Sequence, residues 1–394
     1  MSRNSNETLV FINYSEETFT TTASGAIATY IFECCRAALD QGEAPWVISR
    51  PSSAPTFPWP KTRLIEYPRR PGGWVGTQLT RVQRKTTGLP RLGQRAWAKR
   101  IGRAVLEVAG PECTVVLQND PEVCVYLRAA LPKARIMLLF QNQLPAREPF
   151  RSRLAGSVDE IAAVSDFTAA WVAEHYRLPR DRVSTVYSAV ASDVIRPPAE
   201  RVGAPVIGFV GRTGIEKAAD IVLEAALLLS ERTTDFGVQI VGSNHWGRFE
   251  EDDYQRRLSA LATSLTARGI KVRRPGHVGR EELPEWLQRS SIHVVPSRWD
   301  EPFGLTTLEG MAAGNALVAT RTGGTPEVVG DGGQLFERDD VRGLADLLEQ
   351  LVVDERARAE WGQRARARAE TLTWSRTYNQ LKALVQRERP EMPA

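Results

Sequence analysis

The sequence predicts an α/β protein built from two doubly wound parallel-sheet domains. Short apolar runs alternate with longer amphipathic stretches along nearly the whole chain of 394 residues, and this alternation is typical of repeated βα units. Near the middle, residues 196–205 are rich in Pro, Gly and charged residues and indicate a linker. We therefore expect an N-terminal domain of residues 1–198 and a C-terminal domain of residues 199–373.

The composition is that of an ordinary globular protein, with 42% hydrophobic and 25% charged residues and a net charge of +4. No segment approaches the roughly 20 apolar residues that cross a bilayer, and the polar residues 1–7 do not predict a signal peptide. Neither the cysteines nor the histidines have metal-ligand spacing, and Cys34, Cys35, Cys113 and Cys124 are expected to be buried free thiols. These features predict a cytoplasmic protein without a bound metal.

In the N-terminal domain, the expected strands are short apolar runs with β-branched residues: 8–14, 44–49, 114–118, 135–140, 160–165 and 182–187. The expected helices follow them at 25–41, 91–109, 122–130 and 165–176. Residues 50–91, rich in Pro and Gly, are longer than a usual loop, so we expect an insertion that is either functional or mobile.

A strongly basic stretch runs from Lys61 to Arg103, with twelve Lys or Arg residues and a single acid, Glu66. Trp74 and Trp97 are interleaved with these cations, and the end of the stretch has an amphipathic helical pattern. Two interpretations have equal weight: a solvated basic flank, which could hold a phosphate-bearing acceptor, or peripheral contact with the anionic inner face of a membrane. Nucleic acid is a much weaker alternative, and we expect no nucleic-acid partner.

The C-terminal domain repeats the pattern, with expected strands at 205–210, 238–242, 271–274, 292–296, 316–320 and 335–336. The expected helices are 218–230, 254–268, 340–353 and 355–370, besides one that ends at Gly314. The helix 355–370, rich in Arg, Ala and Glu, is expected to be a solvated surface element and not a ligand site.

The most informative stretch, residues 298–309, follows the fourth expected strand of this domain and enters the helix that ends at Gly314. A strand that feeds a loop and then a helix is where doubly wound sheets bind ligands. The unpaired N–H groups of a helix start suit anionic oxygens, and a glycine such as Gly304 allows close approach to the backbone. The acids also have structural explanations, because Glu309 could form a capping box with its helix and Glu301 could be a solvated loop residue.

A second loop, residues 211–217, follows the first strand of this domain. Its glycine spacing is not the G-x-G-x-x-G of dinucleotide sites, so we expect no nicotinamide cofactor. Arg212 offers a planar fork for phosphate oxygens, and Lys217 lies near a helix N-terminus, where a cation is unfavourable unless an anion is bound. Either cation alone could equally be a solvated loop residue.

These strings together closely resemble the donor-site signature of glycosyltransferase family 4, carried here by Glu301-Pro-Phe-Gly-Leu305, Glu309, Met311-Ala-Ala-Gly314 and Gly323-Gly-Thr-Pro-Glu327. Members of this family are retaining enzymes of the GT-B architecture, in which two Rossmann-like domains face each other across a cleft. The resemblance implies that fold for this chain, with the C-terminal helix 374–394 crossing back to complete the first domain.

The resemblance also implies roles for single residues. Arg212 and Lys217 would grip the donor diphosphate and stabilise the leaving group, and with Glu301, which faces the donor sugar, they form the expected catalytic set. Glu309 would hold the ribose hydroxyls. The other expected donor contacts are the backbone of Phe303, Gly304 and Leu305, the base contacts His277 and Val278, and the backbone of Gly25 in the first domain.

One position departs from the family pattern. Where family members often carry a histidine that contacts the donor sugar, this chain has Gln141 followed by Asn142. Glutamine can donate and accept hydrogen bonds but does not exchange a proton near neutral pH. We therefore expect Gln141 and Asn142 to orient the sugar without acting as acid or base.

The resemblance predicts a retaining, metal-independent glycosyltransferase without a cofactor. The donor would be a UDP- or GDP-sugar and the acceptor a hydroxyl of a glycan, a lipid-linked or a small molecule, in bacterial surface polysaccharide or glycoconjugate biosynthesis. Two alternatives stay open: another GT-B enzyme, such as a sugar-nucleotide epimerase or a phosphorylase, or a catalytically silent subunit that binds a nucleotide sugar.

Overall fold

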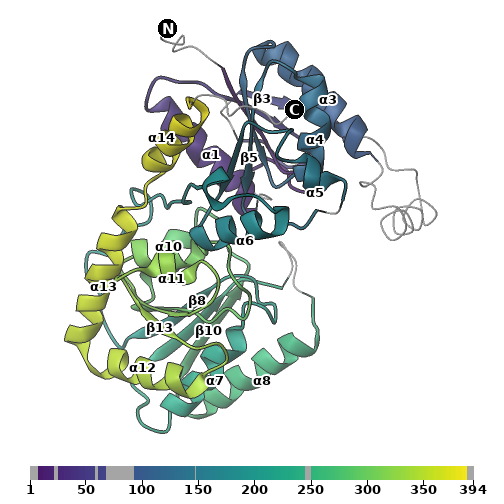
Figure 1. The fold of residues 1–394 in the computed structure, drawn as a ribbon. Coiled ribbons are helices and arrows are strands. Elements are labelled where there is room, and N and C mark those ends of the chain that lie inside the picture. The colour runs from purple at the N-terminus through teal and green to yellow at the C-terminus, as the bar shows by residue number, and fades with distance from the viewer. Residues whose placement is uncertain are drawn as a thin grey trace. The chain divides into compact units, whose positions relative to one another are not determined.

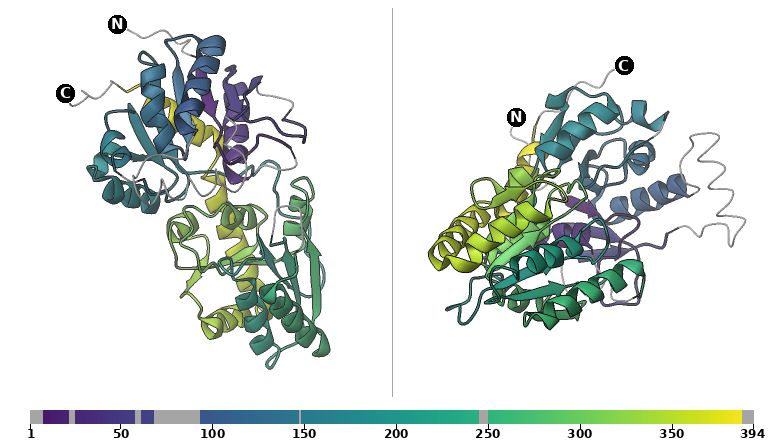
Figure 2. Two further views of the ribbon diagram at one scale, coloured as in Figure 1. Left: turned by 90° about the vertical axis from the view of Figure 1, so that its right-hand side faces the viewer. Right: turned by 90° about the horizontal axis from the view of Figure 1, so that it is seen from below.

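The computed structural model describes residues 8–21, 25–57, 61–67, 93–146, 148–244 and 250–387. They form two compact units, the first Met1–Tyr187 with Trp374–Ala394 and the second Ser188–Thr373 (Figure 1). Each unit is a parallel sheet between helices, as two further views show (Figure 2). The predicted α/β class with two Rossmann-like parallel sheets is confirmed.

The second unit begins at Ser188, before the linker that the sequence predicts. The physical reason is a set of hydrogen bonds from Arg366 of helix α13 (Glu355–Glu370). Its guanidinium donates to the carbonyl oxygens of Ser192 at 3.0 Å and Ile195 at 2.9 Å. These bonds hold the start of the unit against α13.

The first unit contains a seven-stranded sheet of order β3-β2-β1-β4-β5-β6-β7, in which every neighbouring pair is parallel. The strands are β1 (Leu9–Ile12), β2 (Trp46–Ser49), β3 (Lys61–Leu64), β4 (Thr114–Gln118), β5 (Arg135–Phe140), β6 (Glu160–Ala163) and β7 (Val183–Thr185). The helices are α1 (Ala26–Leu39), α3 (Gln94–Ala109), α4 (Pro121–Ala130), α5 (Phe150–Arg153), α6 (Asp166–Tyr176), the 3-10 helix η1 (Arg180–Arg182) and α14 (Trp374–Val385).

Alternate strand residues of the first unit face opposite sides of the sheet and build a core on each. One core joins the strands to α3, α4 and α6 and includes Val115, Leu138 and Val172. Elsewhere α1 packs against α14, where the rings of Tyr30 and Trp374 meet edge to face with their centroids 5.3 Å apart. The C-terminal helix is therefore a structural part of the first unit.

Strand β3 lies inside the segment 50–91, where the sequence predicted an insertion. Its four residues, Lys-Thr-Arg-Leu, are mostly exposed because β3 is the edge strand of the sheet. Charged residues are common on sheet edges, where they oppose pairing with other chains, and they hide the apolar alternation that reveals inner strands. The short helix α5 was also not predicted.

Of the basic stretch, residues 68–92, which include Trp74, lie outside the described part of the chain. The rest of its helical pattern is α3, which buries Trp97, Ile101 and Val105 in the core of the first unit. Its cations lie on the exposed face. The apolar stripe that suggested an amphipathic membrane helix is therefore a core contact.

The four cysteines are buried free thiols, as predicted: Cys34, Cys35, Cys113 and Cys124. Burial raises the pKa of the Cys34, Cys35 and Cys124 thiols well above the usual value. Because the thiolate is the reactive form, these groups are packing residues and not nucleophiles.

The second unit contains a six-stranded parallel sheet of order β10-β9-β8-β11-β12-β13. The strands are β8 (Val206–Val210), β9 (Gly237–Val241), β10 (Lys271–Gly276), β11 (Ile292–Val295), β12 (Ala316–Thr320) and β13 (Gln334–Phe336). The other helices of this unit are α7 (Ala219–Leu229), α8 (Asp253–Ala267), α9 (Leu283–Gln288), α10 (Leu305–Ala312), α11 (Thr325–Val329) and α12 (Val341–Val353).

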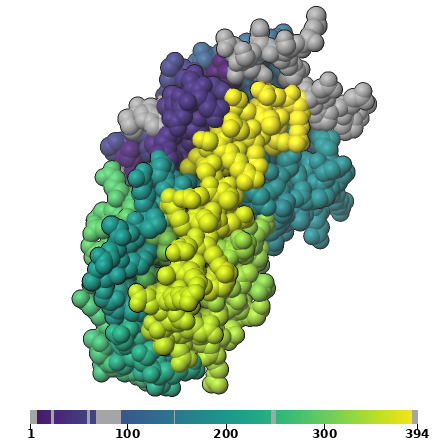
Figure 3. Space-filling model, turned by 90° about the vertical axis from the view of Figure 1, so that its left-hand side faces the viewer, coloured from purple at the N-terminus to yellow at the C-terminus, as the bar shows by residue number. Residues whose placement is uncertain are grey.

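Helices α7, α8 and α12 cover one face of this second sheet in a single core that includes Phe209, Leu258 and Leu348. Helices α10 and α13 pack against β12, and the outer surface of α13 is visible in Figure 3. None of the helices in the described part of the chain is both long and apolar enough to cross a membrane.

Arg135 on β5 ties the C-terminal helix into the first unit. Its buried guanidinium donates to the carboxylate of Glu160 at 2.8 Å and to the carbonyl oxygens of Leu384 at 3.3 Å and Arg387 at 2.6 Å. Because Arg135→Leu leaves a mostly buried carboxylate without its cation, we expect the free energy of unfolding to fall by about 3–5 kcal/mol, measured by urea denaturation.

The exposed Lys133 is the matched control, because its ammonium lies 3.8 Å from the carboxylate of exposed Glu112. Lys133→Leu should change the unfolding free energy by no more than about 0.5 kcal/mol. Equal effects of the two substitutions would contradict the structural role of Arg135.

Candidate active site

The carboxyl ends of all six strands of the second sheet lie at one edge, because the strands are parallel. The chain runs outward from β8 through β9 and β10, then returns to place β11 on the other side of β8. The loops after β8 and β11 therefore start side by side at a topological switch point. This is the place where open α/β sheets bind ligands.

The loop after β8, residues 211–218, is fixed to the loop after β11, residues 296–304. The carbonyl oxygen of Glu216 accepts from the backbone N–H of Arg298 at 2.8 Å and of Trp299 at 3.1 Å. These two donors on one carbonyl hold the two loops in a defined register. We call this pair of loops the β8–β11 site.

Lys217 and Glu301, predicted from separate motifs, meet in the β8–β11 site. The Lys217 ammonium lies 2.5 Å from Oε1 of Glu301, and the Ser297 hydroxyl donates to the same oxygen at 2.7 Å. Glu301 is buried, with 6% of its surface exposed, whereas about a quarter of the Lys217 side chain is exposed. A solvated-loop explanation of Glu301 is therefore wrong, because its carboxylate is buried and receives charge-assisted hydrogen bonds.

The Gly323-Gly324 turn after β12 supports the backbone of Glu301. The N–H of Gly324 donates to the Glu301 carbonyl oxygen at 2.7 Å. Gly323 has φ +54°, and a Cβ at this position would lie 2.4 Å from that same carbonyl oxygen. Only glycine permits both this backbone conformation and this approach.

Helix α10 starts directly after Gly304, whose φ is +91°. No side chain caps it, so the predicted capping box between Thr306 and Glu309 is wrong: Thr306 already lies inside the helix. Apart from the Thr307 N–H, which donates to the Gly304 carbonyl oxygen at 3.0 Å, the first amides of α10 are left for water or a ligand. The ring of Phe303 is buried, so this residue can offer a ligand only its backbone.

Glu309 is half-buried on α10 and follows Leu305 along the same helix. Burial raises the pKa of its carboxyl group, and the positive charge of Arg280 opposes that shift. Since α10 begins in the β8–β11 site, Glu309 lies one to two turns beyond it.

Arg212 and the two predicted base contacts also lie at this edge. Arg212 is exposed and forms an ion pair at 2.8 Å with Glu216 on its own loop. His277 is exposed and Val278 half-buried, directly after β10. Strand β9 separates β10 from β8, so these two residues lie to one side of the β8–β11 site.

The remaining predicted residues belong to the first unit and lie at the carboxyl edge of its own sheet. Gln141 follows β5 and is buried, and its side-chain amide donates to Gln118 Oε1 at 2.8 Å. The N–H groups of Gln141 and Asn142 both donate to Oδ1 of Asn119, at 2.7 and 3.2 Å. These contacts fix the turn in which a sugar-orienting role was predicted.

Gly25 precedes α1 and lies against an internal anion. A Cβ on Gly25 would lie 2.6 Å from Oε1 of Glu17, and the other carboxylate oxygen of Glu17, Oε2, accepts from the Ala28 N–H at 3.3 Å. Burial raises the pKa of Glu17, and the backbone hydrogen bonds from Ala28 and Gly25 oppose that shift. The amino end of α1, predicted to face donor phosphates, thus already has a carboxylate beside it.

The sequence did not reveal the supports of the site. Arg298 forms two parallel hydrogen bonds of 2.9 Å with the buried carboxylate of Asp220, which also accepts from the Tyr254 hydroxyl at 2.6 Å. Burial alone would raise the pKa of Asp220, but the bonds from Arg298 and Tyr254 outweigh it and lower that pKa. Such pairs join residues far apart in the chain, so no local pattern marks them.

His293 on β11 lies under α10. A Cβ on Gly310 would come within 2.3 Å of its ring, so the helix packs directly on the imidazole. Burial lowers the pKa of His293 to about 4, so the ring is neutral near pH 7.

In the part of the chain that the structure describes, no three His, Cys, Asp or Glu side chains form a metal-binding group.

Comparison with known proteins identifies relatives. The sequence profile of the glycosyl transferases group 1 matches residues 192–368. A D-inositol 3-phosphate glycosyltransferase 2 of Catenulispora acidiphila is 32% identical over 344 residues, which are 80% of this chain and 72% of that protein. A D-inositol 3-phosphate glycosyltransferase of Corynebacterium urealyticum is 30% identical over 265 residues, 63% of this chain and 61% of that protein. The match to the Corynebacterium urealyticum protein and two further matches to proteins of the same name cover less than two thirds of those relatives' own length.

Solved structures share the fold. A glycosyltransferase of Rickettsia africae superposes with a TM-score of 0.73 at 16% identity, covering 97% of this chain and 98% of that chain. Anabaena Alr3699/HepE, solved in complex with UDP and glucose, has a TM-score of 0.68 at 16% identity, covering 96% and 98%. At this identity the similarity establishes the GT-B fold and nothing finer.

Gly323→Ala tests the support of Glu301. The added Cβ would collide with the Glu301 backbone in addition to straining a positive φ, so we expect a loss of about 2–4 kcal/mol in unfolding free energy. Gly269→Ala is the matched control, because Gly269 has φ +84° but no atom within 4 Å of an added Cβ. If Gly323→Ala lowers the unfolding free energy in urea denaturation no more than Gly269→Ala does, the contact with Glu301 contributes nothing to stability.

His293 predicts a pH dependence of stability. Its folded pKa of about 4 lies below the unfolded value of about 6.5, so the unfolded chain takes up the proton first. The stability is complete above about pH 6.5 and falls as the pH drops toward 4, by a total of about 3 kcal/mol. Urea denaturation between pH 4 and 7.5 should show this fall in the wild type and its absence in His293→Gln. His277→Gln, at an exposed histidine, should keep the wild-type profile; identical profiles for all three proteins would contradict the assignment.

Proposed function

The chain belongs to the group 1 glycosyltransferases, and on this premise we propose that it transfers a sugar from a nucleoside diphosphate sugar to a hydroxyl acceptor with retention of configuration. The observation that carries the proposal is the Lys217–Glu301 pair at the switch point, beside the free amino end of α10. A cation, a buried carboxylate and unpaired amides at one place suit a substrate that has both a diphosphate and a sugar ring.

The diphosphate is the leaving group, and its negative charge grows as the bond to the sugar breaks. Lys217 and the half-exposed side chain of Arg212 would receive this charge, together with the first amides of α10. Arg212 would exchange its surface partner Glu216 for phosphate oxygens, which a guanidinium binds through two parallel hydrogen bonds. Because these groups supply the positive charge, we propose that transfer does not require a metal.

The two glutamates would bind different parts of the donor. The bonds from Lys217 and Ser297 both reach Oε1 of Glu301, so its other oxygen can accept from a sugar hydroxyl. Glu309, further along α10, would accept from the ribose hydroxyls. A base near His277 and Val278 would complete the nucleotide at the same sheet edge.

The likeness to a structure solved with UDP and glucose supports a UDP-sugar as the first donor to test, with GDP-sugars second. The relatives named for D-inositol 3-phosphate support a small phosphorylated acceptor beside the glycan and lipid-linked acceptors. We place the reaction in bacterial glycoconjugate or surface polysaccharide biosynthesis, as such acceptors suggest.

The experiment is to incubate the purified chain with UDP-, GDP-, ADP- and dTDP-sugars, with and without candidate acceptors, and to follow nucleoside diphosphate release in the presence of EDTA. We expect release from one donor, accelerated by one acceptor class and unaffected by EDTA. Binding of a nucleotide without turnover for any acceptor would favour a silent binding subunit, and interconversion of the sugar without release would favour an epimerase.

Lys217→Ala and Glu301→Gln should each reduce kcat/KM by at least tenfold, because each removes a charged group from the reacting region. Lys133→Ala and Glu337→Gln are the matched controls, since both residues are exposed and lie outside the β8–β11 site. Near-wild-type turnover in a folded Lys217→Ala or Glu301→Gln variant would contradict the assignment of these residues to the active site.

A further inference from the structure

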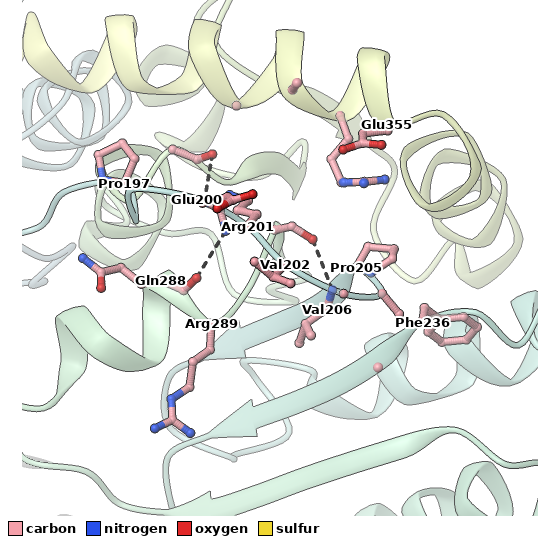
Figure 4. Close-up of a pocket in the computed structure, with 18 of the residues that line it drawn as sticks. Pro197, Glu200, Arg201, Val202, Pro205, Val206, Phe236, Gln288, Arg289 and Glu355 are labelled. Atoms are coloured by element: carbon pink, nitrogen blue, oxygen red, sulfur yellow. Dashed lines mark hydrogen bonds between the residues drawn. The ribbon is translucent and has the colours of Figure 1, made fainter.

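A cavity of about 1170 Å³ lies at the opposite edge of the second sheet from the β8–β11 site. The amino ends of β8, β9 and β10 form one wall, at Val206, Gly237 and Lys271. The segment 197–205 forms a second wall, and one stripe of α13 forms the third (Figure 4). All of these elements belong to the second unit, so the cavity is complete within it. We call it the amino-edge cavity.

The lining of the amino-edge cavity carries an excess of positive charge. Its basic residues are Arg201, Lys271, Arg273, Arg289, Arg358 and Arg366. Its acidic residues are Glu200, Glu355 and Glu370. Glu370 is already paired with Arg366 at 2.7 Å, so the cations exceed the acids that could neutralise them. A cavity whose charge is unbalanced in this way attracts anions.

Two of these arginines are held rigidly by backbone carbonyls. Arg201 donates to Ser290, Ala313 and Gly314, and Arg358 donates to the carbonyls of Leu351 at 2.7 Å and Val352 at 3.1 Å. Carbonyl partners satisfy N–H groups but do not neutralise charge. Burial, together with the nearby charge of Arg358, lowers the pKa of Arg201 to about 10, in keeping with a positive potential here.

Lys271 and Arg273 are the cations that remain available. They are two residues apart on the edge strand β10, so both side chains leave the same face of the sheet, toward the cavity. Arg274, the residue after Arg273, leaves the other face and donates to the Ser259 hydroxyl. Neither Lys271 nor Arg273 forms an ion pair with another of the described residues. Arg289, in contrast, points away in Figure 4, pairs with Glu285 at 2.5 Å and lies over the Trp286 ring.

The same cavity also has an apolar part, formed by Pro205, Phe236 and Val238. Its volume slightly exceeds the usual range for small-molecule sites, about 300–1,000 Å³, so a small ligand has room. We propose that the amino-edge cavity is a second ligand site, which binds a small phosphate-bearing molecule through Lys271 and Arg273 against the fixed charges of Arg201 and Arg358. The site is separate from donor binding and does not rest on the proposed transferase activity.

The test is isothermal titration calorimetry of the full chain with inorganic pyrophosphate. The Arg212→Ala/Lys217→Ala variant removes the cations of the β8–β11 site and should retain one pyrophosphate site. Adding Lys271→Glu/Arg273→Glu to that variant should weaken binding at least tenfold, because the two substitutions invert the charge of the cavity wall. Both residues are at least partly exposed on an edge strand, so the fold should be kept, as circular dichroism would check.

Arg256→Glu/Arg268→Glu is the charge-matched control, on two exposed arginines of the second unit that do not line the cavity. It should leave pyrophosphate affinity within twofold in the same background. The proposal is overturned if no binding remains after Arg212→Ala/Lys217→Ala. It is equally overturned if Lys271→Glu/Arg273→Glu has no effect, or if the control variant weakens binding as much, since attraction would then reflect net charge alone.

Discussion

The structure of the second unit depends on one constraint: a carboxylate buried at a switch point must be neutralised by a group from the neighbouring loop. Glu301 follows β11 and Lys217 follows β8, and their ion pair crosses the boundary at which the strand order reverses. Removing either partner would leave an uncompensated charge in a mostly buried position, which is far more unfavourable than losing a surface pair. Several contacts hold the two residues in place: two backbone N–H groups donate to the Glu216 carbonyl and join the loops, and the Gly323-Gly324 turn fixes the backbone of Glu301.

A second structural role belongs to arginines that donate hydrogen bonds to backbone carbonyl oxygens. Arg201 and Arg366 both donate to the carboxyl end of α10, at Ala312–Gly314, while the amino end of that helix is left open at Gly304. Cations at a helix carboxyl end are favourable because they interact with the negative end of the helix dipole. Helix α13, predicted to be merely solvated, thus supplies a fixed group that helps to hold α10. Gly314, just beyond the carboxyl end of α10, lines the amino-edge cavity, and the amino end of α10 at Gly304 lies in the β8–β11 site.

The sequence predicted the features that depend on residues close together in the chain. Inner strands such as β5 and β12 are continuous apolar runs, and they were located closely because burial on both faces leaves no room for polar residues. Lys217, Glu301 and Gly304 could be singled out because their motifs are contiguous strings. The partners Ser297 and Asp220 were missed, because a hydrogen bond to a distant residue leaves no periodic trace. The capping-box interpretation of Glu309 failed for a different, local reason: Gly304 at positive φ starts α10 earlier than side-chain capping rules expect.

The glycines of the predicted motifs differ in what requires glycine: the backbone conformation at some positions, and a neighbouring side chain at another. Gly304 and Gly323 have positive φ, so the backbone itself demands glycine there, and the backbone they shape is that of the β8–β11 site. Gly25 has φ −83°, which any residue adopts. What excludes a side chain at Gly25 is the carboxylate of Glu17, an internal contact. A glycine before a helix is therefore explained in the first unit without any ligand. The donor site that we propose in the second unit rests on Lys217, Glu301 and α10, and does not require Gly25.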